Sequence, residues 1–536
     1  MDCWRQRNRT LRKIIALLLY VYVLILSVSC STIGAGVASG QKHGTASPTA
    51  QAMNGTPTPT TVVKCLDAPD LPANQPNEPI QVQVNQQCSP GISQYQAGLS
   101  QIDNTLLYGD AGAMSRANNL MKGTLAYENI PLMAWGGVDP WPDPGMPEPS
   151  DWSSLDQRVM HAVNLGLTPV ITLAEAPWWM KGQLQGDGST RVMTAKDEWD
   201  PKITYGTRIL DNKMDAWVHL VQRTAERYMA PPYNVRIFQV WNELKGYFDP
   251  KLDNYDFTIS PGRPDGPNAS HGYTYMYNRV YAALMQVAQS KQIDQTMIKV
   301  GGPYVFMDTW SSTQQSDPSN VIKKFGVFDQ RPFDVIQYWL QHKTGAGFIT
   351  IDGSIENRDT HKLLADPFTG SEIYGEIVKW IRGLNPTFYP GSTTLPIWLA
   401  EWFTSPYIDN FNDVYDNAVK SYAMVKFIAA GGSVALSWGG SGDGSSDQGY
   451  WSPTNYAGGG VAHPWYDTVK ALSTDFGVGK VLYAVSVSDA HQVAALATDQ
   501  KIIIINKTDK TLALTVNGTA TTLTPYQVLV MDSTHQ

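Results

Sequence analysis

From about residue 95 onward, the sequence alternates short apolar runs with longer amphipathic stretches. The amphipathic stretches, such as DWSSLDQRVMHAVNLG and MDAWVHLVQRTAERYM, have the apolar spacing of helices. The apolar runs lie near residues 98 and 130 and begin at residues 168, 235, 297, 348, 395 and 433. Strands that alternate with helices in this way are typical of βα units in a parallel sheet. The pattern therefore predicts a (β/α)8 TIM barrel over residues 95–474.

The pattern changes after the last helical segment, HPWYDTVKALSTDFG. Five short strands, separated by Asn, Asp and Gly turns, follow without intervening helices. This predicts a C-terminal β-sandwich over residues 475–536, which the extended segment 80–94 could join. We expect this domain to brace the barrel, with sugar binding as the alternative role.

The first 30 residues have the features of an export signal. Five basic residues precede an apolar run at residues 14–28, which is shorter than the roughly 20 residues of a membrane-spanning helix. The run ends at Ser29-Cys30, which resembles a bacterial lipobox, although Ser27 stands where such motifs usually have leucine. We expect an extracellular protein, either secreted or held at the cell surface by a lipid on Cys30. An uncleaved anchor is the alternative.

Residues 31–79 are rich in Gly, Ala, Ser, Thr and Pro, which predicts a flexible linker. Cys65 and Cys88 remain as a candidate disulfide outside the cell, and two free thiols are the alternative.

The net charge and the composition indicate which kinds of ligand and partner to expect. The net charge is -8, and no dense basic run follows the N-terminus, so we expect no nucleic-acid partner. The nine histidines form no cluster with cysteine, and Asp443 and Asp447 lack EF-hand spacing, so we expect neither a metal site nor a cofactor. The 17 Trp and 26 Tyr suit carbohydrate recognition, because flat rings are good contact surfaces for sugars. The sequence does not indicate an oligomeric state.

Two glutamates end apolar runs of the predicted barrel. Glu243 closes the fourth run in FQVWNE, and Glu401 closes the seventh in IWLAEW. The working residues of TIM barrels lie at the C-terminal ends of the strands. Burial beside a second carboxylate is expected to raise one of the two pKa values. Such a pair, about 5 to 5.5 Å apart, is what glycosidic hydrolysis with retention requires.

This arrangement resembles that of the clan A glycoside hydrolases, and family 39, the β-xylosidase-like family, is the most similar. The resemblance covers roughly residues 95–536 and rests on the WNE and AEW motifs. It implies that Glu243 is the acid/base, that Asn242 binds a sugar hydroxyl, and that Glu401 is the nucleophile.

The sequence departs from the family pattern at two places. Leu244 follows Glu243 where many clan members have proline. Asp352 stands after the sixth strand, where family 39 tends to carry histidine, so the sugar contacts on that side are expected to differ.

Several further residues are candidates for substrate binding. The resemblance implies that Trp438, at the end of the eighth strand, is a platform beneath the sugar. The remaining candidates are residues near strand ends that could instead pack in the core or form ion pairs. They are Trp135, Trp141, Glu175, Trp178, Trp179, Asp352 and Trp402.

Together these features predict a retaining glycoside hydrolase that cleaves β-glycosidic bonds of an extracellular polysaccharide or oligosaccharide by double displacement. One alternative is a transglycosylase with the same covalent intermediate. Another is a sugar-binding surface lipoprotein without catalysis, against which both glutamates argue.

Overall fold

The structure is a computed structural model. It describes residues 63–65, 71–72, 78–100, 105–133, 137–200, 203, 206–263, 270–310, 316–322, 325–360, 362–363, 366–404, 413–438 and 449–533. These residues belong to one compact unit, Thr60–Gln536. The predicted export signal, most of the predicted linker, Trp135, Asp443 and Asp447 lie outside the described residues. Within the described ranges, no helix has both the length and the apolar character needed to cross a membrane.

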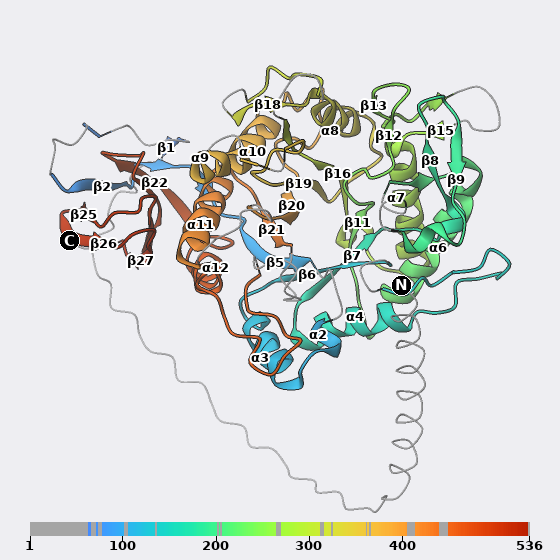
Figure 1. Cartoon of the computed structure of the whole chain (residues 1–536), viewed down its shortest axis with the longest axis horizontal. Coiled ribbons are helices and arrows are strands. Elements are labelled where there is room, and N and C mark those ends of the chain that lie inside the picture. Colours follow the sequence, from blue (N-terminus) through green and yellow to red (C-terminus); the bar gives the residue numbers. More distant parts are fainter. Residues whose placement is uncertain are drawn as a thin grey trace, which may run out of the picture. The chain divides into compact units, whose positions relative to one another are not determined.

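Eight parallel strands form a closed barrel, in which each strand pairs with the next along the chain and the eighth pairs with the first (Figure 1). The predicted TIM barrel is confirmed. Most strand residues are buried, as expected where helices cover the outer face of a parallel sheet. The strands are β5 (Gln96–Ser100), β6 (Tyr127–Pro131), β7 (Thr168–Leu173), β11 (Ile237–Val240), β16 (Lys299–Phe306), β19 (Phe348–Gly353), β20 (Ile397–Trp402) and β21 (Val434–Ser437).

Helices connect the barrel strands. Several begin at an aspartate whose carboxylate accepts a hydrogen bond from a backbone N–H of the first turn, as at Asp110, Asp329 and Asp366. The helices are α2 (Thr105–Tyr108), α3 (Ala111–Met121), α4 (Ser153–Leu165), α6 (Met214–Tyr228), α7 (Tyr273–Ser290), α8 (Gln330–His342), α9 (Pro367–Ser371), α10 (Ile373–Gly383), α11 (Asp413–Ala429) and α12 (Pro464–Asp475).

Polar side chains link the first four strands of the barrel. Asn129 donates to Ser100 Oγ at 2.9 Å and accepts from Thr172 Oγ1 at 2.5 Å. Gln239 donates to Thr172 Oγ1 at 3.1 Å. These side chains are buried, so their mutual hydrogen bonds offset the cost of removing polar groups from water. Gln239 is the member of this network on β11, the strand that precedes Glu243.

A second sheet combines strands that precede the barrel with strands that follow it. β2 pairs antiparallel with β22 and parallel with β25, so residues 80–85 lie within the C-terminal sheet. The first half of β22 pairs with β4 and β23, and its second half pairs with β2. The strands are β2 (Ile80–Asn85), β4 (Gly91–Ile92), β22 (Val481–Val487), β23 (Val493–Thr498), β24 (Lys501–Asn506), β25 (Leu512–Val516), β26 (Thr519–Leu523) and β27 (Val528–Asp532).

The two halves of this sheet enclose a core of their own. Val82 and Leu514 from one half cluster with Val493 and Ile504 from the other. The predicted C-terminal β-sandwich is confirmed. Ile503 and Ile505 alternate with Ile504 along β24 and belong to the main core, where β24 contacts α11.

The remaining elements are short strands and turns of 3-10 helix, and all of them except β1 and β3 lie between barrel strands. The short strands are β1 (Val63–Lys64), β3 (Cys88–Ser89), β8 (Lys181–Leu184), β9 (Thr190–Val192), β10 (Arg208–Ile209), β12 (Phe248–Asp249), β13 (Asn254–Tyr255), β14 (Pro261–Arg263), β15 (Ser270–His271), β17 (Thr309–Trp310) and β18 (Val327–Phe328). The 3-10 turns are η1 (Trp178–Met180), η2 (Asp197–Trp199), η3 (Asp211–Lys213) and η4 (Gln295–Met297).

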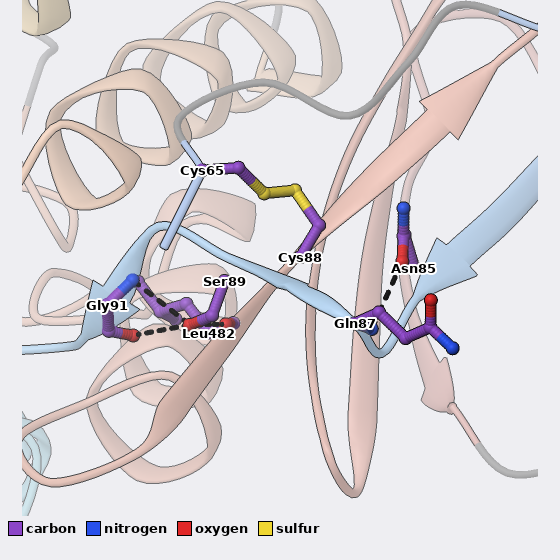
Figure 2. Close-up of a disulfide and its surroundings, with 7 residues drawn as sticks. All are labelled: Cys65, Asn85, Gln87, Cys88, Ser89, Gly91 and Leu482. Carbon is purple, nitrogen blue, oxygen red and sulfur yellow. Dashed lines mark hydrogen bonds between the residues drawn. A yellow bond between two sulfur atoms is a disulfide. The ribbon is translucent and has the colours of Figure 1, made fainter. Parts of the chain in front are cut away.

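Cys65 and Cys88 form a disulfide, with their Cα atoms 5.4 Å apart (Figure 2). This pairing was predicted and is confirmed. The bridge joins β1 to β3, and Ser89 on β3 donates its hydroxyl to Leu482 O at 2.6 Å. The disulfide therefore fastens the start of the described chain to the sandwich.

Candidate active site

Glu243 lies on a tight turn that follows β11. The turn begins at Trp241, whose backbone N–H donates to Leu173 O of β7 at 3.1 Å, and it closes where Lys245 N donates to Asn242 O at 2.9 Å. Trp241, Glu243 and Leu244 have φ values of 70°, 48° and 51°. Left-handed backbone is costly for residues with a side chain and is concentrated at functional sites. The turn therefore stores strain at the residue predicted to be catalytic.

This turn explains why leucine occupies position 244. Proline fixes φ near −65°, whereas Leu244 has a φ of 51° and is buried. The Asn-Glu-Pro pattern of many clan members is therefore incompatible with this backbone. Gly246 has a φ of 78°, and a Cβ at this position would lie 2.0 Å from the carbonyl carbon of Thr207, so only glycine fits.

Lys245 forms an ion pair with Glu243. The distance from Lys245 Nζ to Glu243 Oε2 is 2.5 Å, and the two side chains are 32% and 12% exposed. Burial raises the pKa of Glu243, but the ammonium of Lys245 and a hydrogen bond with Asp352 outweigh this effect and bring the pKa to about 2. Glu243 is therefore a carboxylate at neutral pH.

Glu401 and Asp352 lie side by side on adjacent strands. They are paired in register between β19 and β20, next to a register shift at Ile351/Asp352. A second irregularity lies between Leu399 and Trp402 on the other side of β20. Bulges re-aim side chains, and they are common next to active sites. In this way the strand ends bring the two carboxyl groups together.

Glu243, Asp352 and Glu401 form one group of acids. One carboxyl oxygen of each lies within 4.8 Å of the others. Burial, together with the negative charge of Glu243, raises the pKa of Glu401 to about 8. Burial and the charges of Glu401 and Glu243 raise the pKa of Asp352 well above its ordinary value. The group therefore holds protons at neutral pH, as acid/base chemistry needs.

Three carboxyl groups at this spacing could also surround a cation. However, the ammonium of Lys245 already neutralises Glu243, and Asp352 shares a hydrogen bond with the same carboxylate. The arrangement suits proton transfer better than metal binding.

Tyr304 holds the nucleophile candidate. Its hydroxyl donates to Glu401 Oε2 at 3.1 Å. The residue has a φ of 55° and lies at the register shift between Pro303 and Val305 where β16 meets β19. The shift directs the phenol towards Glu401, and its hydrogen bond favours the carboxylate form.

Arg358 adds a second cation beside the acids. Its guanidinium contacts Asp308 at 2.5 Å and lies over the Phe306 ring, 5.3 Å from the centroid. The side chain is 50% exposed, and its charge acts on Glu243. Burial raises the pKa of Asp308 to about 7, against the opposing charge of Arg358.

The side chain of Asn242 is suited to bind a ligand. The residue is buried, and its Nδ2 has no hydrogen-bond partner in the described part of the chain. An unpaired buried amide is costly, and active sites keep such groups for substrates. Its position next to Glu243 agrees with the predicted contact to a sugar hydroxyl.

Glu175 follows β7 and is fully buried. Lys181 Nζ contacts its Oε2 at 2.8 Å, which is the ion pair that the sequence left open as one of two roles. Its Oε1 has no hydrogen-bond partner among the described residues.

The predicted tryptophans fall into two groups. Trp438 and Trp178 are half-buried: Trp438 follows β21 and packs against Phe403 at 5.7 Å, whereas Trp178 donates its indole N–H to Pro142 O. Both rings keep a partly exposed surface that a ligand could contact.

Trp402, Trp179 and Trp141 are buried in the core, which is the alternative that the sequence left open for them. Trp402 is 2% exposed and packs edge-on against Trp465 of α12. Successive strand residues face opposite sides, so Trp402 faces the helices while Glu401 faces the barrel axis. Trp179 and Trp141 pack on each other at 5.1 Å and are 8% and 6% exposed.

Four residues of the site were not predicted from the sequence: Lys245, Tyr304, Asp308 and Arg358. Lys245 could have been found from its place two residues after Glu243 in WNELK. Tyr304 ends the fifth apolar run, so its position at a strand end was a usable signal. Arg358 lies in an irregular segment, and nothing in the sequence connects it to Glu243.

The fold and the strand-end carboxyl groups together define a closed barrel of eight parallel strands with three acids at its C-terminal edge. No family model matches the sequence, and no curated protein does. Among solved structures, the chain is similar to an endo-β1,6-glucanase, with a TM-score of 0.52, 11% identity, and coverage of 84% of this chain and 93% of that chain. It is also similar to SrfJ from Salmonella typhimurium, with a TM-score of 0.51, 12% identity, and coverage of 85% and 93%.

A family 39 β-xylosidase from Caulobacter crescentus gives a TM-score of 0.44 at 13% identity, with coverage of 81% of this chain and 82% of that chain. The endo-β1,6-glucanase and SrfJ, whose TM-scores exceed 0.5, show that the chain shares their fold. The predicted likeness to clan A enzymes is confirmed at that level.

Proposed function

We propose that the chain is a retaining glycoside hydrolase that acts on β-linked sugars. One observation carries the proposal: carboxyl oxygens of Glu243 and Glu401, at the ends of strands four and seven, lie within 4.8 Å of each other. Retaining enzymes keep their two carboxyl groups about 5 to 5.5 Å apart, whereas inverting enzymes keep about 6.5 to 9.5 Å to hold a water molecule. The spacing supports a direct attack by one carboxylate.

In the first step, Glu401 attacks the anomeric carbon while Glu243 donates a proton to the leaving oxygen. The glycosidic bond breaks, an ester to Glu401 forms, and the aglycone leaves as an alcohol. In the second step, Glu243 removes a proton from water, and the hydroxide attacks the anomeric carbon. Glu401 is released as a carboxylate, which Tyr304 can stabilise by its hydrogen bond. Asn242 is placed to donate to a hydroxyl next to the reacting carbon.

We further propose that the substrate is an extracellular polysaccharide or oligosaccharide. Two considerations support this: the N-terminal sequence has the features of an export signal, and the structures of similar fold include an endo-β1,6-glucanase. Lipid attachment at Cys30 would hold the enzyme at the cell surface.

The proposal is tested by turnover of a panel of aryl β-glycosides and β-linked polysaccharides. Glu243→Gln and Glu401→Gln should each lower kcat by several orders of magnitude on substrates with poor leaving groups. Proton NMR of the first-formed sugar should show the β-anomer. Glu376→Gln is a matched control, because Glu376 is ion-paired with Lys379 on α10 and is 30% exposed. Near wild-type turnover in either active-site variant, or an α-anomeric first product, would contradict the proposal.

The same assay distinguishes a transglycosylase. Both activities use the same covalent intermediate, so they differ only in the acceptor. A hydrolase forms free sugar at a rate that does not depend on added sugar acceptors, whereas a transglycosylase requires them.

A further inference from the structure

Lys245 creates a conflict with the role proposed for Glu243. A residue that protonates a leaving group must carry a proton when the substrate is bound. Yet the ammonium lies 2.5 Å from Glu243 Oε2, and such a contact stabilises the carboxylate against the acid. In the free protein, the intended donor is therefore the ionised member of the pair.

The missing proton lies on the other glutamate. Desolvation and the charge of Glu243 raise the pKa of Glu401, whereas the ammonium of Lys245 lowers the pKa of Glu243. A single proton shared by the pair therefore favours Glu401. One shared proton is what the proposed reaction requires. However, the reaction requires that proton on Glu243 rather than on Glu401.

We infer that Lys245 is a positioning residue that decides which glutamate carries the shared proton, an inference that rests on the proposed function. While the ammonium contacts Glu243, the proton stays on Glu401. When the ammonium moves away, the proton passes from Glu401 to Glu243. Glu401 becomes the carboxylate that attacks, and Glu243 becomes the acid. No proton enters or leaves the pair, so the step needs no further reactant.

The surroundings offer Lys245 another place for its charge. Its side chain is 32% exposed, and a lysine ammonium on a four-carbon stem is mobile. The charge of Lys245 also interacts with Glu401 and Glu175. Glu401 becomes negative when it loses the proton, and Glu175 has an Oε1 without a partner among the described residues. Both carboxylates can therefore stabilise the displaced ammonium.

The other charged and titratable groups around Glu243 do not replace Lys245. Arg358 is held by Asp308, and Asp352 shares a hydrogen bond with Glu243. Tyr304 donates to Glu401. Among the described residues, Lys245 is the cation that contacts Glu243. Its removal should therefore have the largest effect on the difference in pKa between Glu243 and Glu401.

The test is a titration of the whole protein labelled with 13C at the glutamate δ-carbon, which does not depend on activity. Glu243→Gln and Glu401→Gln identify the two resonances by their loss. In the wild type, the Glu243 signal should stay at the carboxylate position from pH 4 to 8, while the Glu401 signal titrates near its pKa of about 8. In Lys245→Met, the Glu243 signal should titrate at a higher pH than in the wild type and at a higher pH than the Glu401 signal, which reverses the wild-type order.

Two variants control the experiment. Lys245→Arg keeps the positive charge and should keep the wild-type titration. Lys379→Met removes a lysine of similar exposure, ion-paired with Glu376 on α10, and should change neither signal. If Lys245→Met does not fold, Lys245→Gln supplies an uncharged side chain that can still donate to Glu243. If Glu243 still titrates at a lower pH than Glu401 in the neutral variants, the inference is overturned.

Kinetics separate this inference from the proposed function. Aryl glycosides with poor leaving groups need the acid most. In Lys245→Met, their kcat/KM should therefore rise relative to that of substrates with good leaving groups. The rise should be about tenfold for each unit by which the pKa of Glu243 increases relative to that of Glu401. An equal loss on both kinds of substrate would mean that Lys245 is only structural, and would overturn the inference. Absence of turnover by the wild type would refute the proposed function, while the titration would still locate the proton.

Discussion

Replacing Glu401 by glutamine should make the fold less sensitive to alkali. The pKa of Glu401 is about 8 in the folded protein against 4.5 as its ordinary value. Because the folded value is the higher one, the contribution of Glu401 to stability is fully present below pH 4.5. It is lost as the pH rises towards 8, since the buried residue must ionise beside Glu243.

The size of the effect follows from the same shift. Each pH unit between the two pKa values changes the free energy of unfolding by about 1.4 kcal/mol. From pH 5 to pH 8 the wild type should therefore lose at most about 4 kcal/mol through this residue. Glutamine cannot ionise but can still accept from Tyr304, so Glu401→Gln should match the wild type at pH 5 and exceed its stability at pH 8.

The assay is urea unfolding of both proteins at each pH unit from 5 to 8, with Glu376→Gln as the control for a surface carboxylate. The difference between Glu401→Gln and wild type should grow with pH, whereas the control should follow the wild type. Parallel curves for Glu401→Gln and wild type would show that Glu401 is already ionised at neutral pH, and the reasoning about the pair would be wrong.

Three further predictions concern the turn, the substrate contact and the disulfide. Gly246→Ala should lower the free energy of unfolding by more than about 2 kcal/mol, because its Cβ would clash with Thr207; Gly123→Ala, with a φ of 75° and no atom within 4 Å, should cost only about 1 kcal/mol in the same denaturation assay. Asn242→Ala should reduce kcat/KM by about tenfold to a hundredfold while the melting temperature stays constant, because its Nδ2 has no partner to lose; a fall in melting temperature would contradict this. Cys88→Ser should cost about 3 kcal/mol in urea unfolding, and a reducing agent should remove the difference from the wild type if the bridge is the cause.

The barrel could be predicted because its strands are buried on both faces. Such strands appear in the sequence as continuous apolar runs, and the helices between them show a separate period. β26 was missed, because it is rich in threonine and Leu523 is its one buried residue. The Asn517-Gly518 turn before it, with φ values of 46° and 88°, was the available hairpin signal.

The site could be predicted only where a residue ends a strand. Glu243 and Glu401 satisfy this rule, and so does Asp352. The contact of Tyr304 with Glu401 depends on register shifts between neighbouring strands, which apolar periodicity does not encode. The core position of Trp402 could have been predicted, because adjacent strand residues point to opposite faces and Glu401 faces inward.

Covalent trapping tests the central claim most directly. An activated 2-deoxy-2-fluoro aryl glycoside of the sugar that the panel identifies should form a stable ester with the nucleophile, and mass spectrometry of the digested protein locates it. The account predicts that the label lies on Glu401. A label on Glu243, the glutamate that is ionised in the free protein, would contradict the assigned roles and the need for Lys245 to move.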